Sequence, residues 1–309
     1  GGSAVRSGLL DRLCRQLSDA GLVWKTFGGA QPNPRLSHAR LGVQEALEFG
    51  ADLILAVGGG STIDTAKAIA IGAANPDTDI WAFWMKERTV ERHPPVGVVL
   101  TIPAAGSETS DSAVLTNEET CSKRGLGTDF NRPAFAVLDP RLAATLPRYQ
   151  VACGVTDILM HTLDRYFNPV YDNHITDALA EALLRVVLDH GLDTVKNPGD
   201  LAHMSEIMWC GSLSHNGLTG AGRGGRGRVG DWASHQLEHE LSGMFDVTHG
   251  AGLAAVWGAW SRYVMPAAPE RFARFARNVM GVQTEGDAAC VALAGIEAFE
   301  NFLRSIDMP

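Results

Sequence analysis

The sequence has few of the features that mark membrane and secreted proteins. Among its 309 residues no apolar run approaches the roughly 20 residues needed to cross a bilayer, and the N-terminus does not resemble a signal peptide. Its cysteines are scattered, without a C-x-x-C pair: Cys14, Cys121, Cys153, Cys210 and Cys290. This usage is typical of the reduced cytoplasm, where disulfides are rare. We therefore expect a cytoplasmic protein that contacts no membrane.

The charge balance excludes a further class of function. The formal net charge is −9, which opposes non-specific binding to the phosphate backbone of nucleic acids. Hydrophobic residues make up 45% of the chain and charged residues 20%, and no internal repeat is visible. This composition and length suffice for two hydrophobic cores, so they agree with a soluble two-domain enzyme.

A group of residues in the second half has the types and spacing of a metal site. Asp157 and His161 are four residues apart in GVTDILMHTLDRYF, so on a helix they share one face, about 5 to 6 Å apart. His235 and His239 have the same spacing, and His249 follows at the expected start of an apolar helix. A carboxylate with three imidazoles suits a divalent transition metal that keeps one position for substrate. One of the later histidines can be spare, and the cluster alone fits a hydrolase, a lyase or a dehydrogenase.

A glycine-rich turn in the first half predicts a phosphate-binding site. In ADLILAVGGGSTIDTAKAIAIGAA an apolar strand ends at residues 58–61 and a helix follows. The first N–H groups of a helix are unpaired and lie at the positive end of its dipole, which favours an anion. The turn is neither G-x-G-x-x-G nor a P-loop, because no G-K-[ST] closes it. Two further candidate turns are TIPAAGSETS, after residues 96–100, and residues 1–3.

The apolar pattern predicts different folds in the two halves. Up to about residue 148 strand-like and helical runs alternate, which is typical of a doubly wound, largely parallel sheet. The expected strands are residues 22–27, 53–57, 96–102 and 135–139, and the expected helices are residues 36–50 and 61–74. Beyond the boundary, near Pro147 to Gln150, the spacing is helical almost throughout.

In combination, these motifs resemble one enzyme family. They occur in a single order over nearly the whole chain: GGSAVRSGLLD, FGGAQPNPR, ADLILAVGGGSTIDTAKAIA, TIPAAGSE, FAVLDPRLAATLP, GVTDILMHTLDRYF, and HQLEHEL followed by THG. In that order they resemble the iron-containing (group III) alcohol dehydrogenases, most closely the NADPH-dependent butanol dehydrogenase and aldehyde reductase subgroup. The resemblance implies the dehydroquinate synthase-like fold. It places an α/β dinucleotide-binding domain at residues 1–148 and an all-α metal-binding domain at residues 149–309.

The resemblance also implies roles for individual residues. The implied metal ligands are Asp157, His161, His235 and His249, while His239 matches a histidine beside the nicotinamide. The implied dinucleotide contacts are Gly1, Gly2, Ser3, Asn33, Gly58, Gly59, Gly60, Ser61, Asp64, Thr101, Ser107 and Lys123. For Lys67 we leave two interpretations open, a contact with the cofactor and a solvated position on a helix surface.

The implied activity is metal-dependent hydride transfer between NADP(H) and an aldehyde or primary alcohol. Residues 1–3 include no acidic side chain to hold a ribose 2′-hydroxyl, and Arg6 follows, so we expect NADP(H) to be preferred over NAD(H). The ligands accept Zn²⁺ or Fe²⁺, and the Irving–Williams order favours zinc. We expect one divalent ion per chain and a homodimer.

Two features depart from the family pattern. The chain opens on Gly-Gly-Ser without a preceding strand and stops at Pro309 before further C-terminal helices, so we expect a fragment or a trimmed sequence. A glycine-rich stretch with Arg223, Arg226 and Arg228 precedes the metal helix. We interpret it as a flexible insertion, the alternative being attraction of a phosphate-bearing ligand.

Three other functions stay open at this point. A lyase of the dehydroquinate-synthase type shares the nucleotide domain, but it calls for Glu in place of Asp157. A metallohydrolase uses similar ligands without the glycine turn. An inactive fragment is the third alternative, because both ends depart from the family.

Overall fold

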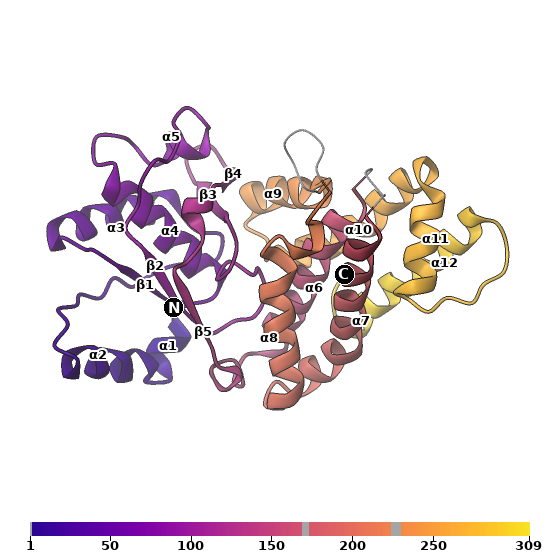
Figure 1. Cartoon of the computed structure of the whole chain (residues 1–309), viewed down its shortest axis with the longest axis horizontal. Coiled ribbons are helices and arrows are strands. Elements are labelled where there is room, and N and C mark those ends of the chain that lie inside the picture. The colour runs from indigo at the N-terminus through magenta and orange to yellow at the C-terminus, as the bar shows by residue number, and fades with distance from the viewer. Residues whose placement is uncertain (1, 169–172, 224–229) are drawn as a thin grey trace. The chain divides into compact units, whose positions relative to one another are not determined.

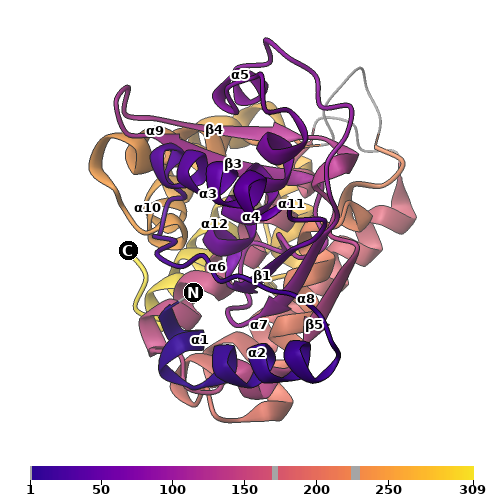
Figure 2. The same ribbon diagram turned by 90° about the vertical axis from the view of Figure 1, so that its left-hand side faces the viewer.

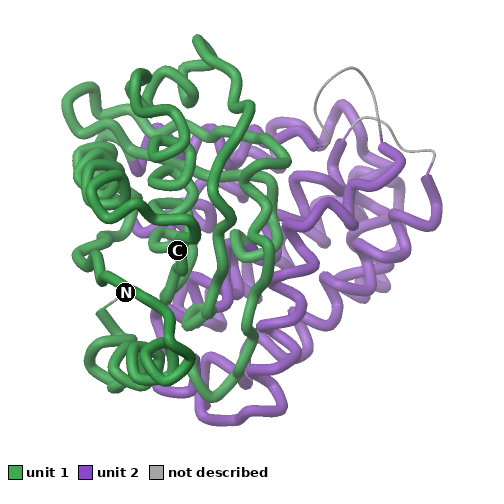
Figure 3. The backbone as a smooth tube through the Cα atoms, turned by 60° about the vertical axis from the view of Figure 1, so that its left-hand side comes forward, with its two compact units in different colours: residues 1–102, 107–142, 243–246 green, residues 103–106, 143–242, 247–309 purple. Residues whose placement is uncertain are grey.

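The computed structural model describes residues 2–168, 173–223 and 230–309. The chain divides into two compact units (Figure 3). Unit 1 comprises residues 1–102, 107–142 and 243–246, and unit 2 comprises residues 103–106, 143–242 and 247–309. The prediction of an α/β N-terminal part followed by a helical C-terminal part is confirmed.

Unit 1 is built around a parallel sheet of three strands in the order β1-β2-β5. These strands are β1 (Ile54–Gly58), β2 (Val96–Leu100) and β5 (Phe135–Leu138). In their register Val57 pairs with Val99, and Val99 pairs with Val137. β2 is buried at every position because it lies between the other two strands, and its sequence is accordingly apolar without alternation. The strands predicted at these three places are confirmed.

Helices cover both faces of this sheet (Figures 1 and 2). The other elements of unit 1 are α1 (Gly2–Arg6), α2 (Leu9–Asp19), α3 (Leu36–Phe49), α4 (Gly60–Ala74), α5 (Trp81–Trp84), β3 (Ser112–Asn117) and β4 (Ser122–Gly127). α1 and α2 lie on one face, where Leu9 is buried with Val57 and Val99. α3 and α4 lie on the other face, in a core that includes Ile71 and Trp84.

The contact between α3 and α4 is close because a glycine lies at it. A Cβ atom on Gly72 would be 2.3 Å from Cγ2 of Val43 and 2.6 Å from Cγ2 of Ile80. Packed interiors do not accommodate such approaches without displacement of the neighbours. The glycine therefore allows α4 to approach α3 closely, and α4 is the helix that follows the glycine-rich turn.

Two features of unit 1 differ from the sequence prediction. The strand expected at residues 22–27 does not form, and Val23 there is 86% exposed. A short apolar run becomes a strand only when a neighbouring strand pairs with it, and in the described part of the chain residues 22–27 pair with no strand. The antiparallel pair β3 and β4 is an addition that the sequence does not predict, because its strands mix polar and glycine residues.

Unit 2 is formed by helices in its described parts. Its α-helices are α6 (Arg148–Tyr166), α7 (His174–Lys196), α8 (Leu201–His215), α9 (Ala233–Phe245), α10 (His249–Val264), α11 (Pro269–Asn278) and α12 (Ala288–Ser305). The last residues of α9 are assigned to unit 1. Short 3₁₀ helices in the chain are Asp129–Asn131, Pro140–Leu142, Leu218–Gly220 and Met265–Ala267.

Helix α6 is the centre of unit 2. It packs against α7, α8 and α10 (Figure 1), and every residue from Val151 to Tyr166 is buried.

Side-chain caps fix the starts of other helices: Asn173 accepts from the Thr176 N–H at 3.2 Å, and Asp287 accepts from the Cys290 N–H at 2.8 Å. None of the helices in the described ranges is long and apolar enough to span a membrane.

Candidate metal and dinucleotide sites

Asp157 and His161 lie on α6, one helical turn apart, as their spacing predicts. Both side chains are buried. Nδ1 of His161 is 3.0 Å from the backbone oxygen of Asp157 and 3.2 Å from its Oδ1. A ring nitrogen that donates to a helix carbonyl leaves Nε2 as the nitrogen with a free lone pair. His161 is therefore fixed on α6 with Nε2 as its donor atom.

His235 of α9 and His249 of α10 converge on the same carboxylate. Nε2 of His235 is 3.8 Å from Oδ1 of Asp157, and Nε2 of His249 is 3.6 Å from it. One donor atom each from Asp157, His235 and His249 lies within 4.8 Å of the other two. His161 is outside that set of three, although the centroid of its ring is 4.6 Å from that of His235. The structure thus brings together all four predicted ligands, three of them more tightly.

The donor atoms themselves show that a divalent ion fits this cluster. Among the described residues, Oδ1 of Asp157 and Nε2 of His235 are buried without a hydrogen-bond partner. Buried polar atoms are rarely left in this state, because each lost interaction with water costs about 1–3 kcal/mol. Imidazole nitrogens with a carboxylate oxygen are ligands that Zn²⁺ and Fe²⁺ accept. A cation bound between these atoms would satisfy both.

A carboxylate contacts the outer nitrogen of two of the histidines. Nδ1 of His235 is 2.5 Å from Oδ2 of Asp164, and Nδ1 of His249 contacts Oε2 of Glu238. Neither acid was predicted from the sequence. The signal was present in the spacing, because Asp164 lies two turns after Asp157 on α6 and Glu238 lies three residues after His235 on α9.

The charges around the cluster favour a cation. Burial disfavours the charged imidazole, yet the carboxylates of Asp164 and Asp157 raise the pKa of His235 to about 9. Burial, followed by the charges of His235 and Arg165, lowers the pKa of His161 well below 6.5. Burial opposes ionisation of Asp157, but the neighbouring His249 and His235 lower its pKa. The carboxylates of Asp157 and Asp164 therefore favour a positive charge beside His235.

His239 lies on α9 one turn after His235, close to the cluster. Its ring centroid is 5.9 Å from that of His249, and its side chain is buried. It forms a second set of near neighbours with Glu238 and His249, and it is not within the set that includes Asp157. This position agrees with a role beside the ligands.

Three residues beside His161 were missed by the sequence analysis. The ring centroid of His215 is 4.0 Å from that of His161, and Nη2 of Arg165 is 3.0 Å from Nδ1 of His215. The guanidinium of Arg165 also stacks over Trp232 at 4.5 Å. Because a guanidinium only donates, Nδ1 of His215 accepts and the ring is neutral. Burial, then the nearby His161 and Arg165 charges, lowers its pKa well below 6.5.

The glycine turn in unit 1 has the geometry expected of a phosphate-binding turn. α4 begins at Gly60, directly after β1, with Gly59 in an extended conformation at the N-cap. A Cβ on Gly58 would lie 2.5 Å from Oγ1 of Thr62, and one on Gly59 would lie 2.9 Å from Cβ of Ile102. The first N–H groups of the helix, from Gly60 and Ser61, have no carbonyl in the preceding turn to bond to. The turn therefore presents backbone donors at the positive end of a 15-residue helix.

Asp64, Ser107 and Lys67 form a buried network beneath that turn. Oδ1 of Asp64 accepts from the Ser107 hydroxyl at 2.5 Å, and its Oδ2 accepts from the Val114 N–H at 2.9 Å. Nζ of Lys67 donates to both Ser107 oxygens, at 2.7 and 2.9 Å, and to the Ser112 carbonyl at 2.8 Å. The solvated interpretation of Lys67 is wrong, since its exposed fraction is 1%. These polar atoms already bond to one another and hold the two turns together.

The other predicted dinucleotide residues lie in two places. Oγ1 of Thr101 is buried and has no hydrogen-bond partner within the described ranges, which makes it available to a ligand. Asn33 donates to Asp246 at 2.8 Å and accepts from Nζ of Lys123 at 3.1 Å. Asn33 and Lys123 therefore belong to one polar group in unit 1.

The expectation for the N-terminal turn is only partly met. Gly2 and Ser3 belong to α1, a helix of five residues ending at Arg6, and Gly1 lies outside the described residues. Nη1 of Arg6 is 3.2 Å from the place that a Cβ on Gly2 would take. The guanidinium of Arg6 thus lies against the start of the chain.

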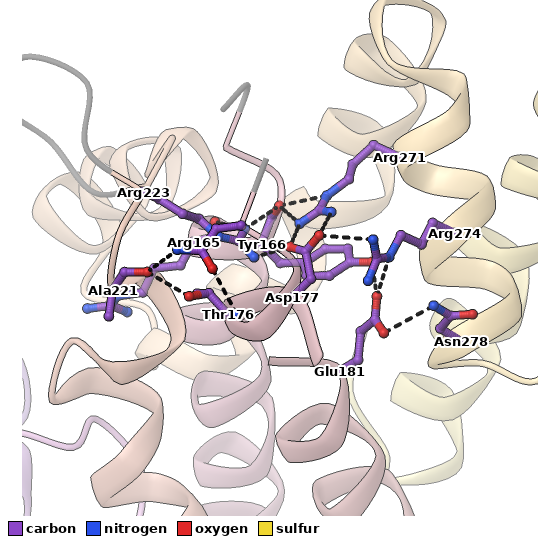
Figure 4. A network of polar contacts seen from close by, with 11 residues as sticks. Arg165, Tyr166, Thr176, Asp177, Glu181, Ala221, Arg223, Arg271, Arg274 and Asn278 are labelled. Atoms are coloured by element: carbon purple, nitrogen blue, oxygen red, sulfur yellow. Dashed lines mark hydrogen bonds and ion pairs between the residues drawn. The ribbon is translucent and has the colours of Figure 1, made fainter. Parts of the chain in front are cut away.

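The interpretation of Arg223 as part of a flexible insertion is wrong. Its exposed fraction is 1%, and its guanidinium contacts the carboxylate of Asp177 and donates to the Arg165 carbonyl at 3.0 Å (Figure 4). Arg223 therefore fixes the polypeptide to the core of unit 2. Arg226 and Arg228 lie outside the described residues.

Comparison with known proteins identifies the family of both halves of the chain. Residues 1–140 match the family described as iron-containing alcohol dehydrogenase. Residues 151–309 match the C-terminal part described for the Fe-containing alcohol dehydrogenase family. The two matches cover the glycine turn and all four predicted metal ligands.

Individual relatives are similar over the whole chain. NADH-dependent butanol dehydrogenase A of Clostridium acetobutylicum is 35% identical, with 100% of this chain and 78% of the relative covered. NADPH-dependent aldehyde reductase YqhD of Escherichia coli is 34% identical, with 100% and 78% covered. The crystal structure of NADH-dependent butanol dehydrogenase A of Thermotoga maritima matches with a TM-score of 0.95 and 36% identity, covering 100% of this chain and 76% of that one. The protein is thus an oxidoreductase acting on CH–OH groups, and it belongs to the iron-containing alcohol dehydrogenase family.

Proposed function

We propose that this enzyme is a metal-dependent, NADP(H)-linked aldehyde reductase and alcohol dehydrogenase for small aldehydes and primary alcohols. One observation carries the proposal: Asp157, His235 and His249 converge, and two of their buried donor atoms lack a hydrogen-bond partner among the described residues. A neutral hydrogen-bonded core would not leave these atoms unsatisfied. A divalent ion bound between these atoms would satisfy both of them.

Asp157, His161, His235 and His249 would hold the ion. When bound, such an ion polarises a carbonyl oxygen and a nicotinamide supplies the hydride. The protein holds the four side chains on three helices, so their positions are set by packing before substrate arrives. We assign His239 to the nicotinamide side, where it orients the ring or passes a proton to the product oxygen.

In unit 1 we propose that the dinucleotide phosphates bind at residues 58–61, where the turn presents backbone donors. Thr101, Asn33 and Lys123 would contact the rest of the cofactor. Ser107 supports the turn by accepting from Lys67 and donating to Asp64. We also propose that residues 1–3 contact the dinucleotide.

The preference for NADP(H) rests on charge. α1 has no acidic residue in its first turn, and Arg6 supplies a positive charge that suits a 2′-phosphate. The relatives include both NADH-dependent and NADPH-dependent enzymes, so similarity does not decide the cofactor preference. The measurement is kcat/KM with each cofactor for the wild type and for Arg6→Ala. A higher value with NADH in the wild type would contradict the proposal.

Zinc or iron is the proposed ion, with one per chain and zinc favoured by affinity. The test is the consumption of NADPH in the presence of butyraldehyde, which is monitored as a loss of NADPH absorbance. Treatment with a strong chelator should abolish this activity, and Zn²⁺ or Fe²⁺ should restore it. Full activity without stoichiometric metal would refute the metal-dependent mechanism. A homodimer and a cytoplasmic location remain expectations, the first of which light scattering can check.

A further inference from the structure

The outer nitrogen of each histidine ligand is held by a different kind of acceptor. Nδ1 of His161 is 3.0 Å from a backbone oxygen, that of His235 is 2.5 Å from Asp164, and that of His249 contacts Glu238. A neutral imidazole that donates from Nδ1 presents a lone pair at Nε2. All three rings are therefore held in the tautomer that a metal bound at Nε2 requires.

The two carboxylates are themselves held in place by serines of α9. Ser234 donates its hydroxyl to Oδ1 of Asp164 at 2.7 Å, and Ser242 contacts Oε1 of Glu238. Neither carboxylate has any exposed surface. One oxygen of each acid thus bonds to a serine and the other faces a histidine, so the acids have a fixed orientation before metal binds.

The surroundings of Asp164 also favour a cation on the far side of His235. The carboxylate of Asp164 is buried and contacts a serine hydroxyl and the ring of His235. A buried charge is costly unless an opposite charge compensates it. A divalent ion on the far side of His235 would provide that compensation through the ring.

We propose that Asp164 and Glu238 are positioning residues, which set the tautomer and the orientation of His235 and His249 and thereby raise the affinity of the site for its divalent ion. This inference rests on the proposed metal site. The two acids act through the histidines and do not contact the substrate or the ion.

The proposal predicts unequal effects at the two positions. The side chain of His235 is 6% exposed, whereas that of His249 is 26% exposed. Water can replace a lost acceptor at His249 more readily than at His235. In Asp164→Asn the amide can also turn its NH₂ group toward Nδ1, which would favour the wrong tautomer.

The experiment measures zinc affinity without reference to activity. Metal-free wild type, Asp164→Asn and Glu238→Gln are titrated with Zn²⁺ in competition with a chromophoric chelator. Loss of such a partner typically weakens metal binding about 10- to 100-fold, and we expect Asp164→Asn near the upper figure and Glu238→Gln near the lower. The visible absorption bands of the Co²⁺-loaded variants should also shift, because the ring orientation changes.

Glu181→Gln is the matched control. Glu181 is another buried carboxylate of unit 2, bonded to Tyr166 at 2.8 Å and to Arg274 at 2.6 Å. Its substitution should lower the unfolding temperature of the metal-free protein and leave the zinc dissociation constant unchanged. A loss of affinity as large as that of Asp164→Asn would show that the effect is structural, and would overturn the proposal.

Other outcomes distinguish failure of the proposed metal site from failure of the positioning role. If wild type binds no stoichiometric Zn²⁺, the proposed metal site is wrong. If wild type binds Zn²⁺ and both variants bind it equally well, the site stands and the positioning role is refuted. Should Asp164→Asn fail to fold, Ser234→Ala removes only the hydroxyl that orients Asp164, and a few-fold weaker affinity is then expected; unchanged affinity would count against the proposal.

Discussion

Substituting Asp177 by Asn should destabilise unit 2 strongly. Asp177 has no exposed surface, and three guanidiniums converge on its carboxylate (Figure 4). Arg271 donates to both oxygens, at 2.6 and 2.8 Å, Arg274 is 3.1 Å away, and Arg223 is in direct contact. The substitution keeps the size of the side chain and removes its charge. Two buried arginines would then face a neutral amide.

The expected loss can be estimated from this geometry. Removing one partner of a buried ion pair costs about 3–5 kcal/mol, because the other charge stays buried without compensation. Arg271 and Arg223 also donate to the Tyr166 carbonyl, at 2.9 and 3.2 Å, and these bonds survive. We therefore expect the lower figure, about 3 kcal/mol. For a unit of this size that corresponds to a fall in Tm of roughly 6–12 °C.

The pH dependence gives the sharper test. Burial opposes ionisation of Asp177, but Arg271 and the neighbouring guanidiniums lower its pKa below the usual 3.8. The charged carboxylate therefore stabilises the fold above pH 3.8, and this contribution is lost as the pH falls through the lower folded-state pKa. The difference in unfolding free energy between wild type and Asp177→Asn should shrink over that range.

Thermal and denaturant unfolding of both proteins across this pH range is the assay. Glu300→Gln is the control in the same unit, since Glu300 pairs with Arg262 at 2.9 Å on the surface, where the arginine side chain is 39% exposed. Exposed pairs contribute at most about 1 kcal/mol. Equal losses in the two variants, or a difference for Asp177→Asn that is independent of pH, would refute the reasoning.

Two further predictions concern the metal ligands and the helix contact in unit 1. His239→Ala should retain stoichiometric metal and lower kcat by about 10²–10⁴, the usual effect of losing a positioned acid or base, whereas His235→Ala should lose the metal. Elemental analysis beside steady-state kinetics checks this, and an empty site in His239→Ala alone would reverse the assignment. Gly72→Ala should destabilise unit 1 by about 1–3 kcal/mol, because its Cβ would lie 2.3 Å from Val43. An unchanged unfolding midpoint would show that α3 and α4 accommodate the added methyl group without loss of stability.

The sequence predicts those parts of the site in which the residues lie on a single helix. The i, i+4 spacing of Asp157 and His161 needs only the helical period, and the structure places both on α6 as expected. The same period places Asp164, seven residues after Asp157, on the same side of α6. His215 is different, because it reaches His161 from α8, and no local period reveals a contact between two helices.

Burial is the property that sequence predicts least well in this chain. Lys67 and Arg223 belong to residue types that are mostly exposed, yet both are buried because several oxygens converge on their charged groups. Conversely, the apolar residues 22–27 do not form a strand, and Val23 stays exposed. The burial or exposure of each residue depends on neighbours that are distant in sequence, so composition and periodicity do not predict it.

The complete burial of α6 has a consequence for local opening of the protein. With no residue from Val151 to Tyr166 facing solvent, its amides should exchange hydrogen only when unit 2 opens as a whole. α9 and α10, which carry His235 and His249, each have exposed residues and should exchange through smaller openings. Metal uptake joins these two helices to one that is already protected. Metal binding should therefore slow amide hydrogen exchange mainly in α9 and α10. Slower exchange in these two helices would thus be a measure of ion binding that is independent of enzyme activity.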